Sequence, residues 1–273
     1  AQLKSHTVGA TLVLTLSNPE FRNALGPEIY AAGTEALIAA ESNPDLKTVV
    51  ITGEGDHFCA GGNLNRLLEN RQRQPQVQAQ SIEGLHGWIQ AIRTFPKPVI
   101  AAVEGACAGA GFSLVLMSDL AVASSHSTFV LAYSNVGLSP DGGATWSLAR
   151  ALPRPLASEI LMLGGKVNAQ QLQSMGLINQ VCEPGKSLNQ ALELAARLNQ
   201  RPPNVLASLK ELLGDGTQAS MATQLQAEKE HFVRNLHQRG LWLHRVIRCQ
   251  LQRQVIAQRP VVARRHVDVV DPH

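Results

Sequence analysis

Short apolar runs alternate with glycine-rich turns and helical patterns along the first half of the chain. Thr7–Leu16 alternates around a glycine and is rich in β-branched residues, which predicts a strand or hairpin. Thr48–Gly53 and Pro98–Val103 are short apolar runs that predict buried strands. Pro27–Glu41 carries apolar residues at helical spacing, and a proline suits the first helical turn. The recurring order of strand, turn and helix predicts an α/β fold with buried strands.

The stretch that follows has a less uniform pattern. Asn63–Gln80 is polar and rich in Gln and Arg, so we expect a mobile helix or loop there. Ile82–Thr94 and Phe112–Met117 have the spacing of helices, whereas Leu120–Ala123 and Thr128–Val130 predict short strands. These elements continue the α/β order.

The pattern becomes helical from Pro153 onward. We expect helices at Pro155–Leu163, Ala169–Met175 and Ser187–Asn199. The expected architecture is therefore an α/β body followed by a helical C-terminal third.

Composition narrows the class of protein. The 273 residues suit one large domain or one domain with a small appendage, and 44% of them are hydrophobic. The net charge of +3 comes largely from Arg and His residues after Gly240, so it does not indicate a nucleic-acid-binding face. No segment has the length and apolarity of a membrane span, so we expect neither nucleic acid nor a membrane as partner.

The cysteines and the first residues of the sequence indicate the cellular compartment of the protein. The four cysteines lie far apart and lack the spacing of metal ligands, so we expect reduced thiols and neither a metal nor a redox cofactor. No apolar secretory leader is visible at the start of the sequence. Together these features favour a cytoplasmic protein.

Two glycine-rich turns carry the first candidate chemistry. They are Phe58–Leu64 (FCAGGNL) and Gly105–Gly111 (GACAGAG), and each follows a buried strand and leads towards a helix. Small residues let a ligand approach the backbone, and free N–H groups at a helix start favour negative charge. Two such donors aimed at one oxygen make an oxyanion hole. Tight packing of strand on helix explains each turn equally well.

Taken in order, the motifs of this chain resemble the crotonase (enoyl-CoA hydratase/isomerase) superfamily. The motifs are RNAL at residues 22–25, FCAGGNL, KPVIAAVEGACAGAGFSLVLMSDLAVAS and GLSPDGG, and the resemblance runs from about Val8 to Gln238. Within the superfamily, the AGAG turn and AYSNVGLSPDGGATW look most like the ring-1,2-epoxyphenylacetyl-CoA isomerases of bacterial phenylacetate degradation. The resemblance implies a crotonase (ClpP-like) ββα spiral with a helical C-terminal region.

The resemblance also assigns backbone donors. It implies that the N–H groups of Gly62 and Ala110 form an oxyanion hole for a thioester enolate. Fixed N–H donors stabilise the charge on the enolate oxygen without reorganising. The residues that the resemblance places against coenzyme A are Arg22, Ala24, Ala60, Gly62, Leu64 and Ala110.

The acid and base groups of this chain depart from those of the superfamily's hydratases. Hydratases of the superfamily use two glutamates, and those positions align with Ser113 and Tyr133 in this chain. Adding water needs one group to activate water and another to protonate carbon, so a standard hydratase mechanism is not expected. Asp141 aligns with the catalytic aspartate of the ring-epoxide isomerases, and one carboxylate suffices to move a proton between carbons. A plain turn residue is the alternative, because Pro-Asp-Gly forms β-turns.

His86 supports a different reaction. His86 and Asp141 align with the histidine and the aspartate nucleophile of 4-chlorobenzoyl-CoA dehalogenases, and Tyr133 aligns with an active-site tryptophan of those enzymes. That combination suits attack by the carboxylate and then hydrolysis with histidine as base. A surface or core histidine without catalytic role is the alternative. Tyr133 either contacts the acyl group or packs in the core.

The leading hypothesis is an acyl-CoA isomerase of the enoyl or ring-epoxide type that uses Gly62, Ala110 and Asp141. The rivals are an enoyl-CoA hydratase with other acid and base groups, a hydrolytic dehalogenase, and a CoA-binding protein without turnover. The resemblance implies a homotrimer or hexamer, with an acyl-CoA as substrate. We expect a core at residues 1–200, a helical trimerisation region at 201–239 and an atypical basic tail at 240–273.

Overall fold

The computed structural model describes residues 1–238, and the predicted tail at 240–273 lies outside them. The chain divides into two compact units, Ala1–His231 and Phe232–His273. Of the second unit, the described residues form the end of the last helix, α10 (Met221–His237). The expected domain boundary near residue 200 stays a prediction.

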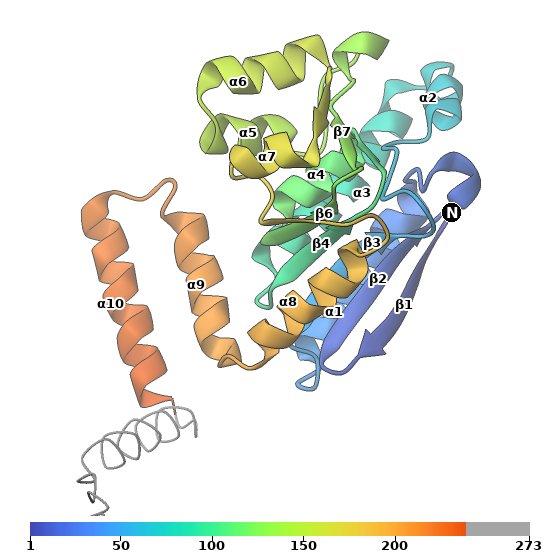
Figure 1. Ribbon diagram of the computed structural model, residues 1–273. Coiled ribbons are helices and arrows are strands. Elements are labelled where there is room, and N and C mark those ends of the chain that lie inside the picture. Colours follow the sequence, from blue (N-terminus) through green and yellow to red (C-terminus); the bar gives the residue numbers. More distant parts are fainter. Residues whose placement is uncertain (239–273) are drawn as a thin grey trace, which may run out of the picture. The chain divides into compact units, whose positions relative to one another are not determined.

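The first unit contains a six-stranded sheet with strand order β1-β2-β3-β4-β6-β9 (Figure 1). The first two strands form a hairpin, one of the two alternatives predicted for Thr7–Leu16, but it begins earlier, at Gln2, and it turns at Gly9 with a φ of 57°. Every later neighbour pairs in parallel. The strands are β1 (Gln2–Val8), β2 (Thr11–Ser17), β3 (Thr48–Gly53), β4 (Val99–Val103), β6 (Leu120–Ser124) and β9 (Gln180–Cys182).

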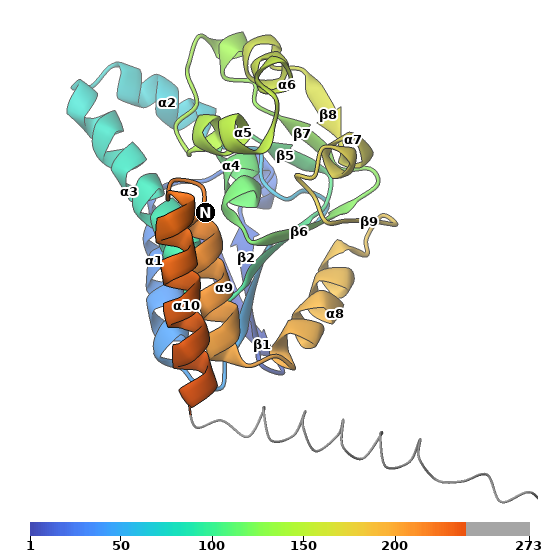
Figure 2. The same cartoon turned by 90° about the vertical axis from the view of Figure 1, so that its left-hand side faces the viewer.

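Helices cover both faces of this sheet, which is why nearly every position of β2, β3 and β4 is buried. Leu14 and Ile51 belong to the larger core cluster, to which α1 (Pro27–Ser42) and α3 (Pro75–Thr94) also contribute. Val50 lies in a smaller cluster with residues of α8 (Ser187–Asn199). Figure 2 shows α1 and α3 on one side of the sheet and α8 on the other.

A second sheet of three short strands adjoins the glycine-rich turns. Its order is β5-β7-β8, with β5 parallel to β7 and β7 antiparallel to β8. The strands are β5 (Ala106–Ala108), β7 (Thr128–Val130) and β8 (Lys166–Asn168). The turn predicted at 105–111 therefore contains a strand.

The remaining helices follow the predicted pattern with shifted ends. The polar stretch 63–80 contains one whole helix and the start of another, because α3 begins at Pro75 and not at Ile82. The helix predicted at 155–163 divides into an α-helical and a π-helical part. These helices are η1 (Pro19–Phe21), α2 (Leu64–Arg71), α4 (Ala110–Met117), η2 (Ser134–Val136), α5 (Ala144–Ala151), α6 (Arg154–Ser158), η3 (Glu159–Leu163), α7 (Ala169–Ser174) and α9 (Pro203–Asp215).

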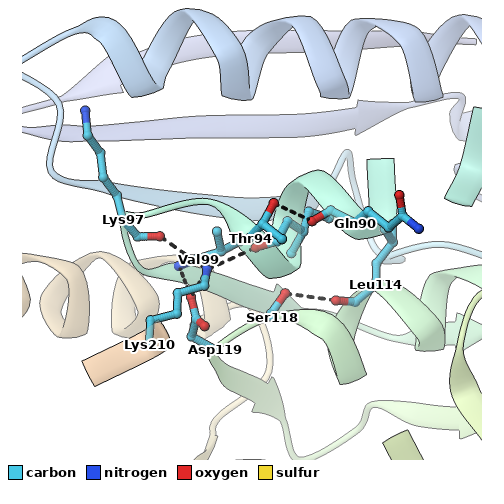
Figure 3. Close-up of polar contacts among 9 residues, drawn as sticks. Gln90, Thr94, Lys97, Val99, Leu114, Ser118, Asp119 and Lys210 are labelled. Atoms are coloured by element: carbon cyan, nitrogen blue, oxygen red, sulfur yellow. Dashed lines mark hydrogen bonds and ion pairs between the residues drawn. The ribbon is translucent and has the colours of Figure 1, made fainter. Parts of the chain in front are cut away.

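A largely buried ion pair fastens α9 to the α/β body (Figure 3). Lys210 Nζ lies 2.7 Å from Asp119 Oδ2 and also donates to the carbonyl oxygen of Ile92 at 3.0 Å. The same Asp119 oxygen accepts the Val99 N–H at 2.8 Å, at the start of β4. Burial raises the pKa of Asp119 and lowers the pKa of Lys210, and the opposite charge of each partner counteracts both shifts.

We predict that Lys210→Met lowers the free energy of unfolding by roughly 3 kcal/mol, because it leaves the Asp119 charge buried without its partner. Lys4→Met is the matched control: its ion pair with Glu54 is also 2.7 Å long, but the two side chains are 48% and 36% exposed. That exposed pair is screened by solvent, so its loss is expected to change the free energy of unfolding little. Urea unfolding measures both variants, and equal losses would contradict the assigned role of Lys210.

Candidate active site

The two glycine-rich turns run side by side as parallel backbone segments. Cys59 and Cys107 form an isolated parallel bridge, and the Ala108 N–H donates to the Cys59 carbonyl at 2.8 Å. The bridge joins residues 48 positions apart (107 − 59), and Gly62 and Ala110 are also 48 apart (110 − 62). A Cβ on Gly109 would lie 3.7 Å from the Gly61 Cα, so the residues just before Gly62 and Ala110 lie side by side, and Gly62 and Ala110 line the same cavity.

Close approach of the two segments requires glycine. Gly61 has a φ of 94°, and a Cβ at that position would lie 2.9 Å from the Ala108 carbonyl oxygen. On the opposite segment, a Cβ on Gly111 would lie 2.7 Å from the carbonyl oxygen of Cys59. Both contacts are with backbone atoms, so a side chain at either glycine forces one of the two segments to shift.

The N–H groups of Gly62 and Ala110 are not among the hydrogen-bond donors of residues 1–238. Ala110 is the first residue of α4, where an N–H has no acceptor within the helix. The positive end of the helix dipole lies at the same place. Two free donors on adjacent segments provide what an oxyanion hole needs.

The segment that contains Arg22 and Ala24 packs beside the first turn. The Arg22 carbonyl accepts the Ala60 N–H at 2.9 Å, and the Leu25 N–H donates to the Gly61 carbonyl at 2.8 Å. These bonds hold the segment along the edge of the candidate oxyanion hole.

Asn23 fixes this segment from inside, and the sequence analysis missed it. Its buried amide donates to the carbonyl oxygens of Glu54 at 2.9 Å and His57 at 2.7 Å, and accepts the Asn18 N–H at 2.9 Å. Arg22 and Asn23 both have positive φ, 48° and 58°. Three hydrogen bonds from one amide stabilise that unusual backbone.

Asp141 lies in the loop before α5, and its carboxylate meets Tyr133. The Tyr133 hydroxyl donates to Asp141 Oδ1 at 2.8 Å. A Cβ on Gly109 would lie 3.5 Å from the same hydroxyl oxygen, so Tyr133 connects the carboxylate to the second turn. Burial and the negative charge of Asp141 raise the pKa of Tyr133, which keeps the phenol protonated.

Ser113 is fully buried and packs closely against the Asp141 loop. Its Oγ donates to the Gly109 carbonyl at 3.4 Å. A Cβ on Gly142 would lie 2.7 Å from the Ser113 Cβ, so the two positions touch. The position therefore supplies packing for the loop and no carboxylate.

His86 contacts the backbone of Asp141 and not its carboxylate. Its Nε2 lies 2.5 Å from the Asp141 carbonyl oxygen, and the side chain is exposed. A carbonyl oxygen only accepts hydrogen bonds, so Nε2 carries the proton. In this arrangement His86 holds the loop that presents Asp141.

One cavity of about 670 Å³ joins these features. Asp141 is the only carboxylate and Arg66 the only Lys or Arg side chain among its lining residues, all of which lie within the described part of the chain. Tyr30 and Arg66 line it and were missed by the sequence analysis. Of the predicted site residues, the cavity wall contains Ala60, Gly62, Leu64, His86, Ala110, Tyr133 and Asp141.

Two predicted coenzyme A contacts lie elsewhere. Ala24 lines a neighbouring hollow of about 420 Å³, and Arg22 lines neither space. Within residues 1–238, no group of three His, Cys, Asp or Glu side chains is arranged to hold a metal ion. The helices of this part of the chain are too short or too polar to span a membrane.

Comparison with known proteins identifies the family. The family model for enoyl-CoA hydratase/isomerase matches residues 7–241. The chain is 33% identical over 229 residues to 1,2-epoxyphenylacetyl-CoA isomerase of Escherichia coli K12, covering 83% of this chain and 87% of that protein. It is 32% identical over 227 residues to 2,3-dehydroadipyl-CoA hydratase of the same strain, covering 81% and 85%.

A solved structure confirms the fold. The crystal structure of an enoyl-CoA hydratase from Polaromonas sp. JS666 is 63% identical, with a TM-score of 0.87 over 87% of this chain and 93% of that one. The chain therefore belongs to the enoyl-CoA hydratase/isomerase family of the crotonase superfamily, whose members act on acyl-CoA thioesters. The predicted crotonase fold is confirmed.

We predict that Gly61→Ala lowers the free energy of unfolding by about 1–3 kcal/mol, because the new methyl group meets the Ala108 carbonyl in a left-handed backbone. Gly87→Ala, on the exposed side of α3 with nothing within 4 Å, is the control and gains about 0.5–1 kcal/mol. Chemical denaturation measures both changes. A Gly61 variant as stable as the wild type would refute the close packing of the turns.

Proposed function

We propose that this chain is an acyl-CoA isomerase of the enoyl or ring-epoxide type, acting through a thioester enolate. The observation that carries the proposal is the presence of one carboxylate, Asp141, among the residues that line the cavity with Gly62 and Ala110. One carboxylate can take a proton from one carbon and return it to another. Water addition in the standard form uses two such groups.

In the proposed reaction, the thioester oxygen accepts a hydrogen bond from each of the N–H groups of Gly62 and Ala110. Asp141 removes a proton from the α carbon of a 3-enoyl thioester, and the electron pair of the C–H bond delocalises onto the thioester oxygen. The resulting dienolate is stabilised because the two donors are already in place. The same proton then returns to the γ carbon, which moves the double bond into conjugation and restores the carboxylate.

Tyr133 positions the base in this reaction. Its hydroxyl donates to Asp141 Oδ1, so it holds one carboxylate oxygen and orients the other for proton transfer. His86 supports the same loop through the Asp141 carbonyl. Arg22, Ala24, Ala60 and Leu64 are proposed contacts of coenzyme A, which is part of the substrate, and no further cofactor is needed. We also propose a cytoplasmic trimer or hexamer.

Enoyl-CoA hydratase is the second candidate. A solved relative and a curated relative carry hydratase names. Hydration in this site would need water activated by Asp141 and a second proton donor, and the Tyr133 phenol that donates to Asp141 is the candidate for that donor. The dehalogenase alternative is disfavoured because His86 points at the Asp141 backbone and not at its carboxylate.

We predict that Asp141→Asn abolishes isomerisation of 3-enoyl-CoA to 2-enoyl-CoA, with a fall in kcat of at least about 10²-fold, because the amide cannot accept the proton. The formation of the conjugated thioester is followed by its ultraviolet absorbance. The control is Asp45→Asn, an exposed change outside the cavity. Undiminished isomerisation in Asp141→Asn would remove this residue from the mechanism. Release of 3-hydroxyacyl-CoA by the wild type would instead favour the hydratase.

We predict that Tyr133→Phe lowers kcat for isomerisation by roughly 10-fold while KM changes little, because the carboxylate loses one orienting hydrogen bond. Binding of the thioester depends on other contacts, so a purely structural role would raise KM as well. A hydratase that uses the phenol as its acid would lose water addition and keep double-bond migration. Steady-state kinetics with 3-enoyl-CoA and 2-enoyl-CoA separate these outcomes.

A further inference from the structure

The chain has two tyrosines, and both line the cavity that contains Asp141. Tyr133 uses its hydroxyl to hold Asp141 Oδ1. Within residues 1–238 the Tyr30 side chain makes no hydrogen bond, because the bond that Thr34 donates at 3.0 Å ends on the Tyr30 carbonyl. The Tyr30 oxygen is not among the unpaired side-chain atoms of this range that are closed off from solvent. The cavity therefore presents a free and accessible phenol.

Tyr30 lies on α1 and packs against the part of α3 that reaches the Asp141 loop. A Cβ on Gly84 of α3 would lie 3.5 Å from Tyr30 Cδ2. Two residues further along α3, His86 contacts the Asp141 carbonyl oxygen. Tyr30 does not line the neighbouring hollow with Ala24, a proposed contact of coenzyme A. These contacts associate the phenol with the segment that holds Asp141, and not with that hollow.

The charge of Asp141 also acts on the Tyr30 phenol. Burial is the largest cause that raises the pKa of Tyr30, the negative charge of Asp141 is the next, and the positive charge of Arg66 opposes both. A phenol whose pKa is raised stays protonated, so its hydroxyl is an uncharged hydrogen-bond donor. An anion at this hydroxyl would meet the negative charge of Asp141. The fitting acceptor is therefore an uncharged oxygen.

Binding of an acyl chain changes the surroundings of this hydroxyl. In the open cavity water can solvate it, but an acyl chain that enters the cavity displaces that water. The aliphatic side chains of Leu67, Ile82 and Leu85, which line the same cavity, offer no acceptor. A plain hydrocarbon chain then leaves the donor unpaired, which costs free energy. The acyl group can avoid that cost by carrying the acceptor itself.

We propose that Tyr30 is a specificity-determining residue whose hydroxyl donates a hydrogen bond to an uncharged oxygen atom on the acyl group. The preferred substrates are then thioesters whose acyl group carries an ether, epoxide or hydroxyl oxygen. The proposal rests on the proposed function, because it assumes that an acyl-CoA occupies this cavity. The amide oxygens of the pantetheine arm offer the same acceptor chemistry, and the experiment separates the two sources.

Calorimetry with saturated thioesters tests the proposal without any turnover. Propoxyacetyl-CoA, 3-ethoxypropanoyl-CoA and 4-methoxybutanoyl-CoA each replace one CH₂ group of hexanoyl-CoA by an ether oxygen, at successive positions of the chain. Tyr30→Phe removes only the hydroxyl and is expected to weaken binding of at least one ether thioester by about 5-fold or more. Binding of hexanoyl-CoA is expected to change by less than about 2-fold, because its chain offers the hydroxyl no acceptor.

Thr34→Val is the matched control. It also removes a hydroxyl from α1, one turn beyond Tyr30, but Thr34 does not line the cavity. This variant is expected to bind every thioester as the wild type does. Tyr30→Phe removes a group without a partner in the described chain, so its unfolding in urea is expected at the same denaturant concentration as the wild type or a higher one.

A loss confined to one or more ether thioesters in Tyr30→Phe supports the proposal. Equal losses for the ether thioesters and hexanoyl-CoA would assign the hydroxyl to the pantetheine arm or to the shape of the cavity, and overturn it. No loss for any ether thioester would overturn it as well, as would the same loss in Thr34→Val or no binding of the ether thioesters to the wild type.

The failure of this proposal differs from the failure of the proposed function. A wild type whose binding of an ether thioester depends on Tyr30, but which does not isomerise 3-enoyl-CoA, would contradict the isomerase alone. A wild type that isomerises 3-enoyl-CoA, with a Tyr30→Phe variant that binds every thioester as tightly, would contradict the oxygen-binding role of Tyr30 alone.

Discussion

The parallel contact between the two glycine-rich turns is the constraint on which the rest of the site depends. The Cys59–Cys107 bridge sets the register, and Gly61 lets the backbones meet. Burial raises the pKa of Cys59 to about 12, so its thiol stays neutral and acts as a small packing group. Gly62 and Ala110 follow directly on these contacts and line one cavity, so the backbone of the two turns, and no side chain, positions the proposed donors.

Much of the fold was predictable because its signals are local. The apolar run of β3 and the glycines that follow it are typical of a buried strand that leads into a tight turn, and the structure has both there. Strands β5, β8 and β9 were missed because each has three residues and too few β-branched or aromatic side chains to stand out, whereas β7, equally short, was predicted. The helix boundary at Pro75 was missed because a polar surface helix shows little apolar periodicity.

The residues of the candidate site also divide into those that the sequence could indicate and those that it could not. Asp141 and the turns lie in motifs whose order carries the family resemblance, so the sequence could indicate them. Asn23 belongs to one of those motifs, but its role depends on carbonyl groups of Glu54 and His57 that are distant in the sequence. Arg66 has no sequence signal at all, because an unpaired Nε exists only once the chain has folded around it. Tertiary contacts therefore determine how a shared motif is used.

Membership of the family predicts that an enolate forms, but it does not predict which product forms from that enolate. After a proton leaves the α carbon, the product depends on which groups can next deliver a proton or water. Here a half-buried, neutral phenol stands beside the single carboxylate that residues 1–238 contribute to the cavity wall, and Ser113 packs closely against Gly142. A phenol whose pKa is raised is a weak proton donor for the second step of hydration, whereas a carboxylate that has just accepted a proton can return it. The pairing of Asp141 with Tyr133 therefore supports the proposed isomerisation over the alternative addition of water.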